Sequence, residues 1–192
     1  SEGQVQRGQE AWLSAGGQQL GSIWGHGSYV APDWSADWLH REALALRAIW
    51  AKQDFKQPFE QLSVGQQAEL NARLKVEMRR NTYDAQTGTL TLSPERFEAV
   101  QQVVQHYMGL FGNDASLDKL REQYAMSAGS LPDPLDLQAL PAFMFWSSWS
   151  AATDRPGETD LSYTSNWPHE PLVGNTPTAG AGIWSIASII FM

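Results

Sequence analysis

The sequence contains no cysteine among its 192 residues. This absence excludes disulfide bonds, thiolate metal sites, cysteine nucleophiles and the thioether attachment of a c-type haem. It does not identify the compartment, because cysteine-free proteins also occur in oxidising compartments. Charged residues are few, at 18%, and hydrophobic residues make up 42%, so the composition is that of a globular protein rather than a disordered one.

Positive charge is also scarce. The 13 Lys and Arg residues are outnumbered by 21 Asp and Glu residues, which gives a net charge of −8. A nucleic-acid-binding protein needs a basic face for the phosphates, and docking on anionic lipid through electrostatics needs a polybasic patch. We therefore expect neither nucleic acid nor an anionic membrane surface as an electrostatic partner.

The nine tryptophans are many for a chain of this length. Each indole ring can bury a large apolar area, but its N–H group then needs a hydrogen-bond partner. One interpretation is a core built around aromatic surfaces. The alternative is a periplasmic carbohydrate-binding module, which uses exposed, coplanar tryptophans as stacking platforms.

Apolar periodicity and capping residues predict a mainly α-helical protein with one small β-hairpin. Helices are expected near residues 4–14, 35–50, 63–80, 93–111, 116–124 and 134–149, and the hairpin over 83–92 with Gly88 in its turn. Ser63 and Gln66 form a capping box, and Ser93 precedes a proline at the first helical position. Residues 154–180 show little periodicity, and an irregular segment of this length is often functional.

Two groups of side chains are candidates for chemistry. Asp33, Asp37 and His40 are spaced so that they could share a metal ion, although capping and partial burial are the commoner roles of such residues. His169 and Glu170 lie between two prolines and could form an acid–base pair, as in a small hydrolase, or simply stiffen a docking loop. His106 lies among helical residues and is expected at the surface.

The two ends of the sequence differ in character. The N-terminal residues are polar and do not resemble a signal peptide, whereas residues 182–192 are apolar to the last position. A membrane-spanning helix needs roughly 20 such residues. We expect one domain over residues 1–180 and the first part of a membrane helix over 181–192.

The segment over residues 21–42 includes Gly25-His26-Gly27-Ser28-Tyr29-Val30-Ala31-Pro32, in which two glycines flank a histidine. It closely resembles the quinol-dependent nitric oxide reductase family just after its first membrane helix. Three later stretches resemble the same family in the same order, namely residues 81–84, 151–157 and 163–175. The resemblance spans most of the chain.

This resemblance implies a cytochrome c-like helical domain that has lost its haem. Relatives that accept electrons from cytochrome c carry Cys-x-x-Cys-His followed by Gly-x-Gly-x-Tyr-x-Ala-Pro. Alignment on that pattern places Gly17, Gln18, Gln19, Leu20 and Gly21 at the position of the haem motif, where neither cysteine nor histidine occurs. Aromatic residues, Trp24 among them, are expected to fill the space that a haem would occupy.

The resemblance further implies the extracytoplasmic domain of an inner-membrane enzyme that reduces nitric oxide to nitrous oxide with electrons from quinol. That enzyme holds haem b, haem b3 and a non-haem iron in its membrane domain. This domain is then a structural cap over that membrane domain, with no catalytic residues of its own and no separate cytochrome c as partner. Gly27 and Tyr29 match positions that help bind calcium in relatives, so they are expected as calcium ligands in the full enzyme only.

Overall fold

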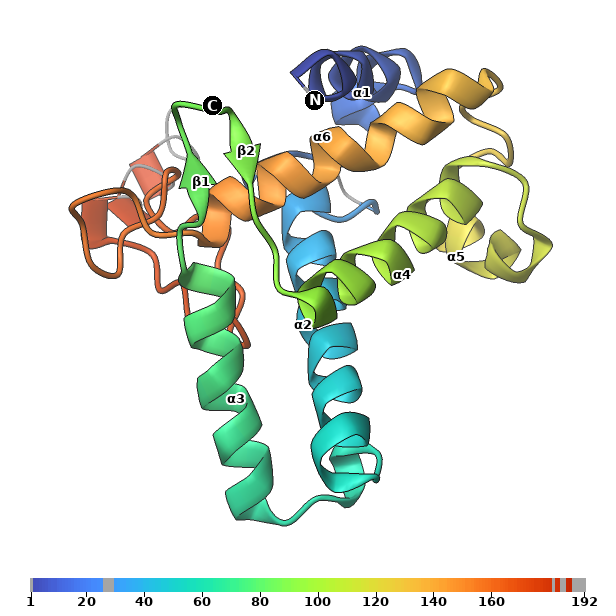
Figure 1. Cartoon of the computed structure of the whole chain (residues 1–192). Helices are drawn as coiled ribbons and strands as arrows, with labels where there is room; N and C mark the ends of the chain where they lie inside the picture. Colours follow the sequence, from blue (N-terminus) through green and yellow to red (C-terminus); the bar gives the residue numbers. More distant parts are fainter. Residues whose placement is uncertain (1, 26–29, 181, 184–185, 188–192) are drawn as a thin grey trace.

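The computed structural model describes residues 2–25, 30–180, 182–183 and 186–187, and this part of the chain is mainly α-helical (Figure 1). The α-helices are α1 (Glu2–Ser14), α2 (Trp34–Trp50), α3 (Val64–Arg79), α4 (Pro94–Phe111), α5 (Asp118–Gln123) and α6 (Pro134–Ala152). The strands β1 (Tyr83–Asp84) and β2 (Thr89–Leu90) form an antiparallel hairpin. The predicted fold class, a mainly helical chain with one hairpin, is confirmed.

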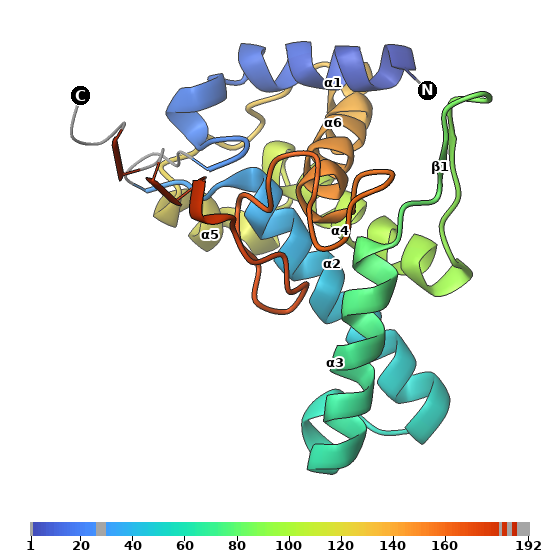
Figure 2. The same ribbon diagram turned by 90° about the vertical axis from the view of Figure 1, so that its left-hand side faces the viewer.

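The helices form a body and a projecting arm. In Figures 1 and 2, α1 lies on α6 at one end of the body, and the arm points away from them. The arm consists of the end of α2, the π-helical turn η2 (Ala51–Phe55), the 3₁₀ turn η3 (Phe59–Gln61) and α3. Figure 2 shows residues 154–180 crossing in front of α2 as an irregular segment.

The helix starts follow from capping side chains. Ser63 and Gln66 make the predicted capping box of α3, and Ser93 caps α4 ahead of its proline. Two helix starts differ from the predicted ones by one or two residues. Helix α2 begins at Trp34, one residue before the predicted start at Ser35, because the carboxylate of Asp33 caps it by accepting a hydrogen bond from the amide of Ala36.

The second displaced start concerns the segment before α5. Asp114 caps the 3₁₀ turn η4 (Ala115–Leu117) and accepts a hydrogen bond from the amide of Ser116, the residue predicted as the cap. The α-helix begins only at Asp118. An aspartate two residues earlier is the better acceptor for these amides, so the helical path starts with a tight turn.

Aromatic side chains fill much of the interior, which agrees with the first interpretation of the tryptophan content. Five of the nine tryptophans are buried, namely Trp12, Trp34, Trp38, Trp50 and Trp149. Exposed, coplanar tryptophan platforms are therefore not the pattern of the described residues, and the carbohydrate-binding alternative loses its main support. In α4, Phe97 fits the apolar periodicity that predicted the helix but is 56% exposed, whereas Val103 and Leu110 are buried.

A buried ion pair joins α2 to α4. The Arg96 Nε group donates to Glu42 Oε1 at 2.7 Å, and the Trp38 indole donates to Glu42 Oε2 at 2.9 Å. Arg96 also donates to the carbonyl of Glu77 at the end of α3. Both charged residues are almost inaccessible to solvent, so each depends on the other for compensation of its charge.

His106 is half-buried, whereas the sequence had suggested a surface position. Its ring meets the ring of Tyr107 edge-on at 5.8 Å, and its Nε2 atom is buried without a hydrogen-bond partner among the described residues. Burial and the positive charge of Arg41 lower the pKa of His106, against an opposing effect of Asp37. The folded chain therefore favours the neutral form of the imidazole.

No helix formed by the described residues is long and apolar enough to cross a membrane. Only four residues of the apolar C-terminal segment, 182–183 and 186–187, fall within the described part. The expected membrane helix over 181–192 and the domain boundary before it therefore stay predictions.

Removal of one partner of the buried ion pair should destabilise the fold strongly. We expect Glu42→Gln to lower the free energy of unfolding by about 3–5 kcal/mol, because Arg96 then keeps a buried, uncompensated charge. Chemical denaturation monitored by circular dichroism measures this. The exposed Glu69→Gln is the matched control and should change stability by less than about 0.5 kcal/mol. Equal effects of the two substitutions would contradict the role of the pair.

The stability of the chain should fall at acidic pH partly through His106. The unfolded chain binds a proton at His106 near its ordinary pKa of about 6.5, whereas the folded chain binds it only at lower pH. Stability is therefore lost as the pH falls through about 6.5, until the lowered folded pKa is passed. Unfolding free energies of the wild type and His106→Gln, compared between pH 8 and pH 5, should show the smaller loss in the variant. Identical pH profiles would rule this out.

Candidate functional site

The segment at the predicted position of the haem motif is tightly packed against an indole ring. Gly17–Leu20 form the 3₁₀ turn η1, and Gly21 follows with a φ of 118°. A Cβ atom on Gly21 would lie 2.4 Å from the carbonyl oxygen of Pro32 and 2.5 Å from Nε1 of Trp34. The backbone of Gly21 therefore lies directly on the side chain of Trp34.

Trp34 occupies the interior next to this segment. It is fully buried, and three aromatic rings surround it, those of Tyr107, Phe111 and Tyr124, at centroid distances of 5.9, 5.4 and 5.8 Å. The predicted filling residue Trp24 is 43% exposed and lies at the surface instead. Trp24 was the wrong choice because it precedes a glycine-rich turn, whereas Trp34 begins a helix whose buried face enters the core.

Asp33 holds the chain before α2 in place. Its carboxylate accepts hydrogen bonds from the hydroxyl of Ser22 at 2.6 Å and from the amide of Gly25 at 2.5 Å, and also from the hydroxyl of Ser35. The same carboxylate also accepts the hydrogen bond that caps α2, so one side chain makes all four hydrogen bonds. Asp33 is a structural hub, which its position before an apolar helix could have indicated.

The predicted metal group does not assemble. Asp37 accepts from Arg41 Nε at 2.7 Å and from the Tyr107 hydroxyl at 3.0 Å, whereas His40 pairs with Glu170. Within the part of the chain that is described, no three His, Asp or Glu side chains are placed to hold a metal ion. The proposed set of Asp33, Asp37 and His40 is wrong because each side chain points to a different partner.

The side chains of His169 and Glu170, the alternative candidates for an acid–base pair, do not contact each other. His169 Nδ1 lies 3.1 Å from the carbonyl oxygen of Asn175, while Glu170 Oε2 lies 3.3 Å from Nδ1 of His40. Glu170 is 7% exposed and also accepts a hydrogen bond from the amide of Leu172. The two neighbours thus act separately, and both stabilise the loop, as the structural alternative predicted.

Asn175 is the centre of that loop. Its side-chain amide is fully buried and donates to the carbonyls of Ala151 at 3.0 Å and Pro168 at 2.7 Å. Its oxygen accepts from the amide of Glu170 at 2.7 Å. These bonds tie the irregular segment to the end of α6, and the sequence offered no signal for them.

The loop and the glycine–histidine segment meet at one point. Gly25 has a φ of 99°, and a Cβ atom on it would lie 1.4 Å from Nε1 of Trp167. Only a glycine lets the backbone approach the indole ring this closely. His26, Gly27, Ser28 and Tyr29 lie outside the described residues, so the predicted calcium ligands Gly27 and Tyr29 stay untested.

The other two stretches singled out from the sequence join the same face. Asn81 donates to the carbonyl of Asp154 at 3.0 Å and to the hydroxyl of Tyr163 at 2.9 Å. The largely buried Arg79 pairs with Asp154 and donates to the carbonyl of Gly174. The described residues of the four stretches (21–25, 30–42, 81–84, 151–157 and 163–175) are thus linked to one another although they are distant in the sequence, and we call the region that they form the motif face.

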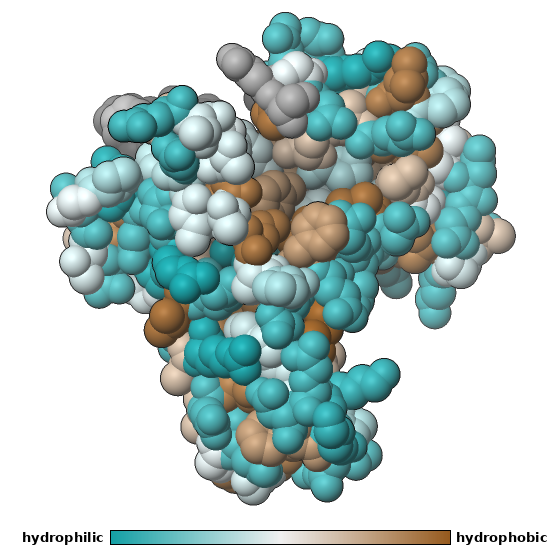
Figure 3. Space-filling view, in the orientation of Figure 1, coloured by the Kyte–Doolittle hydropathy of each residue, from teal (hydrophilic) through white to brown (hydrophobic). Residues whose placement is uncertain are grey.

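Two hollows stand out on the surface formed by the described residues. The first, of about 390 Å³, lies on the motif face and is called the aromatic hollow; it is lined by Trp24, Tyr83, Trp146, Trp149, Ser150, Tyr163 and Thr164. In Figure 3, apolar side chains gather between the hairpin and the helices of the body, whereas the arm is mostly polar. The sequence contains each of these aromatic residues, but it does not indicate that they lie close together in the folded chain.

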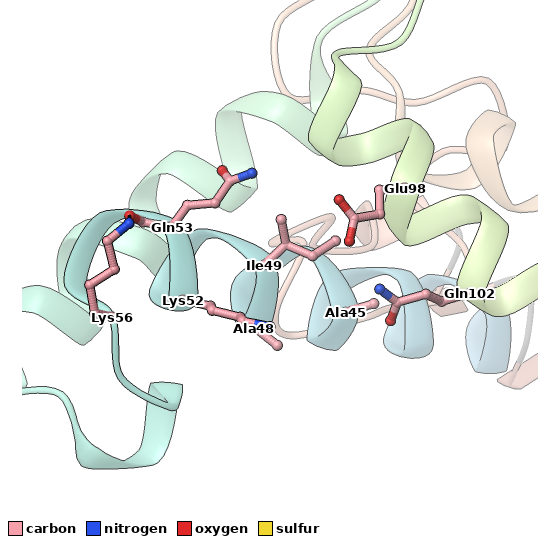
Figure 4. A pocket seen from close by; sticks show the side chains of 8 residues that line it. All are labelled: Ala45, Ala48, Ile49, Lys52, Gln53, Lys56, Glu98 and Gln102. Atoms are coloured by element: carbon pink, nitrogen blue, oxygen red, sulfur yellow. Dashed lines mark hydrogen bonds between the residues drawn. The ribbon is translucent and has the colours of Figure 1, made fainter.

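The second hollow is a groove of about 630 Å³ between α2 with its π-helical turn and the start of α4 (Figure 4). Lys52, Gln53 and Lys56 lie at one end, and Glu98 and Gln102 face them from α4. Its lining includes no histidine, serine or aromatic residue. None of the residues that line this groove lies in the four stretches. The motif face is therefore the better candidate site.

An added methyl group at Gly25 should disrupt the motif face. We expect Gly25→Ala to displace Trp167 and to lower the free energy of unfolding by about 1–3 kcal/mol, as overpacking does. Gly157→Ala is the matched control, because Gly157 has a similar φ of 82° but nothing within 4 Å of an added Cβ. Denaturation curves and near-ultraviolet circular dichroism compare the two. A loss at Gly25 no larger than at Gly157 would show that the indole contact is unimportant.

Comparison with protein families assigns the chain. The model of the NorB cytochrome c-like family, which describes the cytochrome c-like domain of nitric oxide reductase, matches residues 1–169. This range includes three of the four stretches and the start of the last one. A search among curated proteins found no match. The cytochrome c-like character implied by the resemblance is confirmed. The chain belongs to the NorB family of cytochrome c-like domains of nitric oxide reductase.

Proposed function

We propose that this chain is the extracytoplasmic domain of a quinol-dependent nitric oxide reductase of the inner membrane, and that it acts as a haem-free structural cap over the membrane domain of the same enzyme. The enzyme would reduce two molecules of nitric oxide to nitrous oxide with electrons from quinol. The observation that carries this proposal is the segment Gly17–Leu20 with Gly21, where the haem motif of the relatives would lie.

The residues present there do not fit a c-type haem. The sequence has no cysteine for thioether bonds, and the segment has no histidine to ligate iron. The interior beside it is filled by Trp34, against which the backbone of Gly21 packs closely. A porphyrin would have to displace this ring and the aromatic cluster around it. The domain then has no part in electron relay, which suits an enzyme whose donor dissolves in the bilayer.

A docking role is supported by the motif face. Four separate stretches are held together there by buried side chains, among them Asn175 and Arg79. Irregular backbone that is fixed in this way can present a defined surface to a partner. Ile183 and Ile186, which follow the face, are 68% and 62% exposed, and such apolar side chains would be covered by a membrane domain.

The cofactors of the full enzyme would lie outside this chain. Haem b, haem b3 and the non-haem iron would belong to the membrane domain, where nitric oxide reacts and quinol is oxidised. A calcium ion held with the help of Gly27 and Tyr29 remains part of the proposal. The net charge of −8 agrees with the absence of nucleic acid from the expected partners.

The choice of electron donor tests the proposal in the full-length enzyme. We expect nitric oxide consumption with a reduced quinol analogue and none with reduced cytochrome c. The pyridine haemochrome spectrum should show b-type haem only, and the 192-residue chain alone should show no Soret band. Turnover supported by cytochrome c, or a c-type haemochrome, would contradict the proposal.

The docking role needs a separate measurement. In the full-length enzyme, Gly25→Ala should lower quinol-dependent turnover and increase protease cleavage between this domain and the membrane domain. Gly157→Ala should leave both unchanged, because its added methyl group meets no neighbouring atom. Equal protease sensitivity of the two variants would speak against docking through the motif face, even if the donor experiment succeeded.

A further inference from the structure

The aromatic hollow presents ring faces at several angles. Trp146 and Trp149 stack with centroids 5.0 Å apart and planes at 21°. Tyr83 meets Trp146 at 68°, and Tyr163 meets Trp149 at 32°. With Trp24, five aromatic side chains from four separate segments surround a space of about 390 Å³, which lies in the size range of small-molecule sites.

The rings are fixed in place before any ligand binds. Trp24 has a φ of 58°, a conformation that a bulky residue adopts only when its surroundings hold it there. Its indole N–H donates to the carbonyl of Ser147 at 2.8 Å, although the side chain remains 43% exposed. The Tyr163 hydroxyl is held by Asn81. A preorganised aromatic surface of this kind loses little conformational entropy on binding.

The polar groups of the hollow are few, and one of them, the indole N–H of Trp149, is buried without a hydrogen-bond partner among the described residues. The Ser150 hydroxyl donates to the carbonyl of Ser147, and the Thr164 hydroxyl donates to the carbonyl of Trp167. None of the described residues that line the hollow is charged. An ammonium or guanidinium group would therefore bring N–H donors that lack good acceptors, whereas a quaternary ammonium group carries no N–H donor at all.

The surroundings of the hollow carry negative charge. Residues 81–84 and 154–164, which bear Tyr83 and Tyr163, contain four carboxylates (Asp84, Asp154, Glu158 and Asp160) and one cation (Arg155), a net charge of −3. Arg79 pairs with Asp154, and its Nε lies 3.8 Å from Asp160 Oδ1, so two cations and four carboxylates give these segments a net charge of −2 once Arg79 is counted. None of these carboxylates lines the hollow, so the attraction for a cation there comes from the ring faces through their quadrupoles.

We propose that the aromatic hollow binds a quaternary ammonium group of the choline type. The methylated cation would rest on the faces of the aromatic rings, which supply the attraction. The hollow lies on the motif face, which the proposed function docks on the membrane domain, so the site is tested on the 192-residue chain, in which this face is uncovered.

The proposed site is tested by comparing the binding of a cation with the binding of an uncharged molecule of the same shape. Tryptophan fluorescence of the chain is titrated with choline and with 3,3-dimethyl-1-butanol, its uncharged isostere, at constant ionic strength maintained with sodium chloride. We expect saturable binding of choline at least about tenfold tighter than that of the isostere, since a cation–π contact at a partly desolvated site has this strength. Equal affinities, or no saturable change with choline, would overturn the proposal.

Two substitutions test whether choline binds in the aromatic hollow. Both leave every tryptophan in place, because tryptophan fluorescence is the measured signal. Tyr83→Leu removes a lining ring that is 38% exposed, and Phe97→Leu removes an exposed ring of α4 outside the hollow. The first should weaken choline binding about fivefold or more, and the second should leave it unchanged. Thermal unfolding confirms that both variants are folded. Equal affinities of the two variants would place the cation elsewhere and overturn the assignment.

The origin of the cation is resolved by a further comparison. Flotation is measured with vesicles of phosphatidylcholine and with vesicles of phosphatidylethanolamine and phosphatidylglycerol. Binding to the first alone, lost in Tyr83→Leu, would identify a lipid headgroup as the ligand and support the site. Binding of free choline without binding to either vesicle would support the same site for a soluble quaternary amine.

Discussion

Two indole rings lie directly on glycine backbone, and the arrangement of the rest of the domain depends on these contacts. Trp34 packs against Gly21, and Trp167 packs against Gly25. Both glycines have positive φ values and no side chain, so the segment between them can pass through a space that any other residue would block. Asp33 completes the arrangement by binding this segment to the start of α2.

The long irregular segment after α6 is possible because buried side chains replace regular secondary structure. A buried backbone group without a partner is costly, so a loop of this length inside a domain needs other partners. Asn166 and Asn175 are almost fully buried and supply several of them through their amide groups. The loop therefore has a defined structure although it lacks regular secondary structure.

Membership of the cytochrome c-like family and the loss of the haem motif fit together physically. A cytochrome c-like fold without a bound cofactor keeps its helices only if side chains fill the space that a cofactor would take, because a large cavity would cost stability. Here the aromatic cluster around Trp34 fills the interior beside residues 17–21. The same richness in aromatic residues leaves a ring-lined hollow at the surface, where five side chains from distant segments meet.

Local sequence patterns were sufficient to predict the helices, most of their caps and the hairpin, since these depend on periodicity and on contacts over three or four residues. The capping box at Ser63 and the proline after Ser93 illustrate this local control. The absence of cysteine, also evident from the sequence, excluded a covalently bound haem.

Long-range packing, in contrast, selects which polar residues pair and which tryptophan fills the core. His40 with Glu170, and Gly25 with Trp167, are joined across more than a hundred residues, and no short-range pattern encodes such contacts. Phe97 shows the same limit, because it fits the apolar periodicity of its helix but faces solvent where no other element covers it. The buried face of a helix is chosen by the shape of its neighbours in three dimensions, which the order of residues along one helix does not contain.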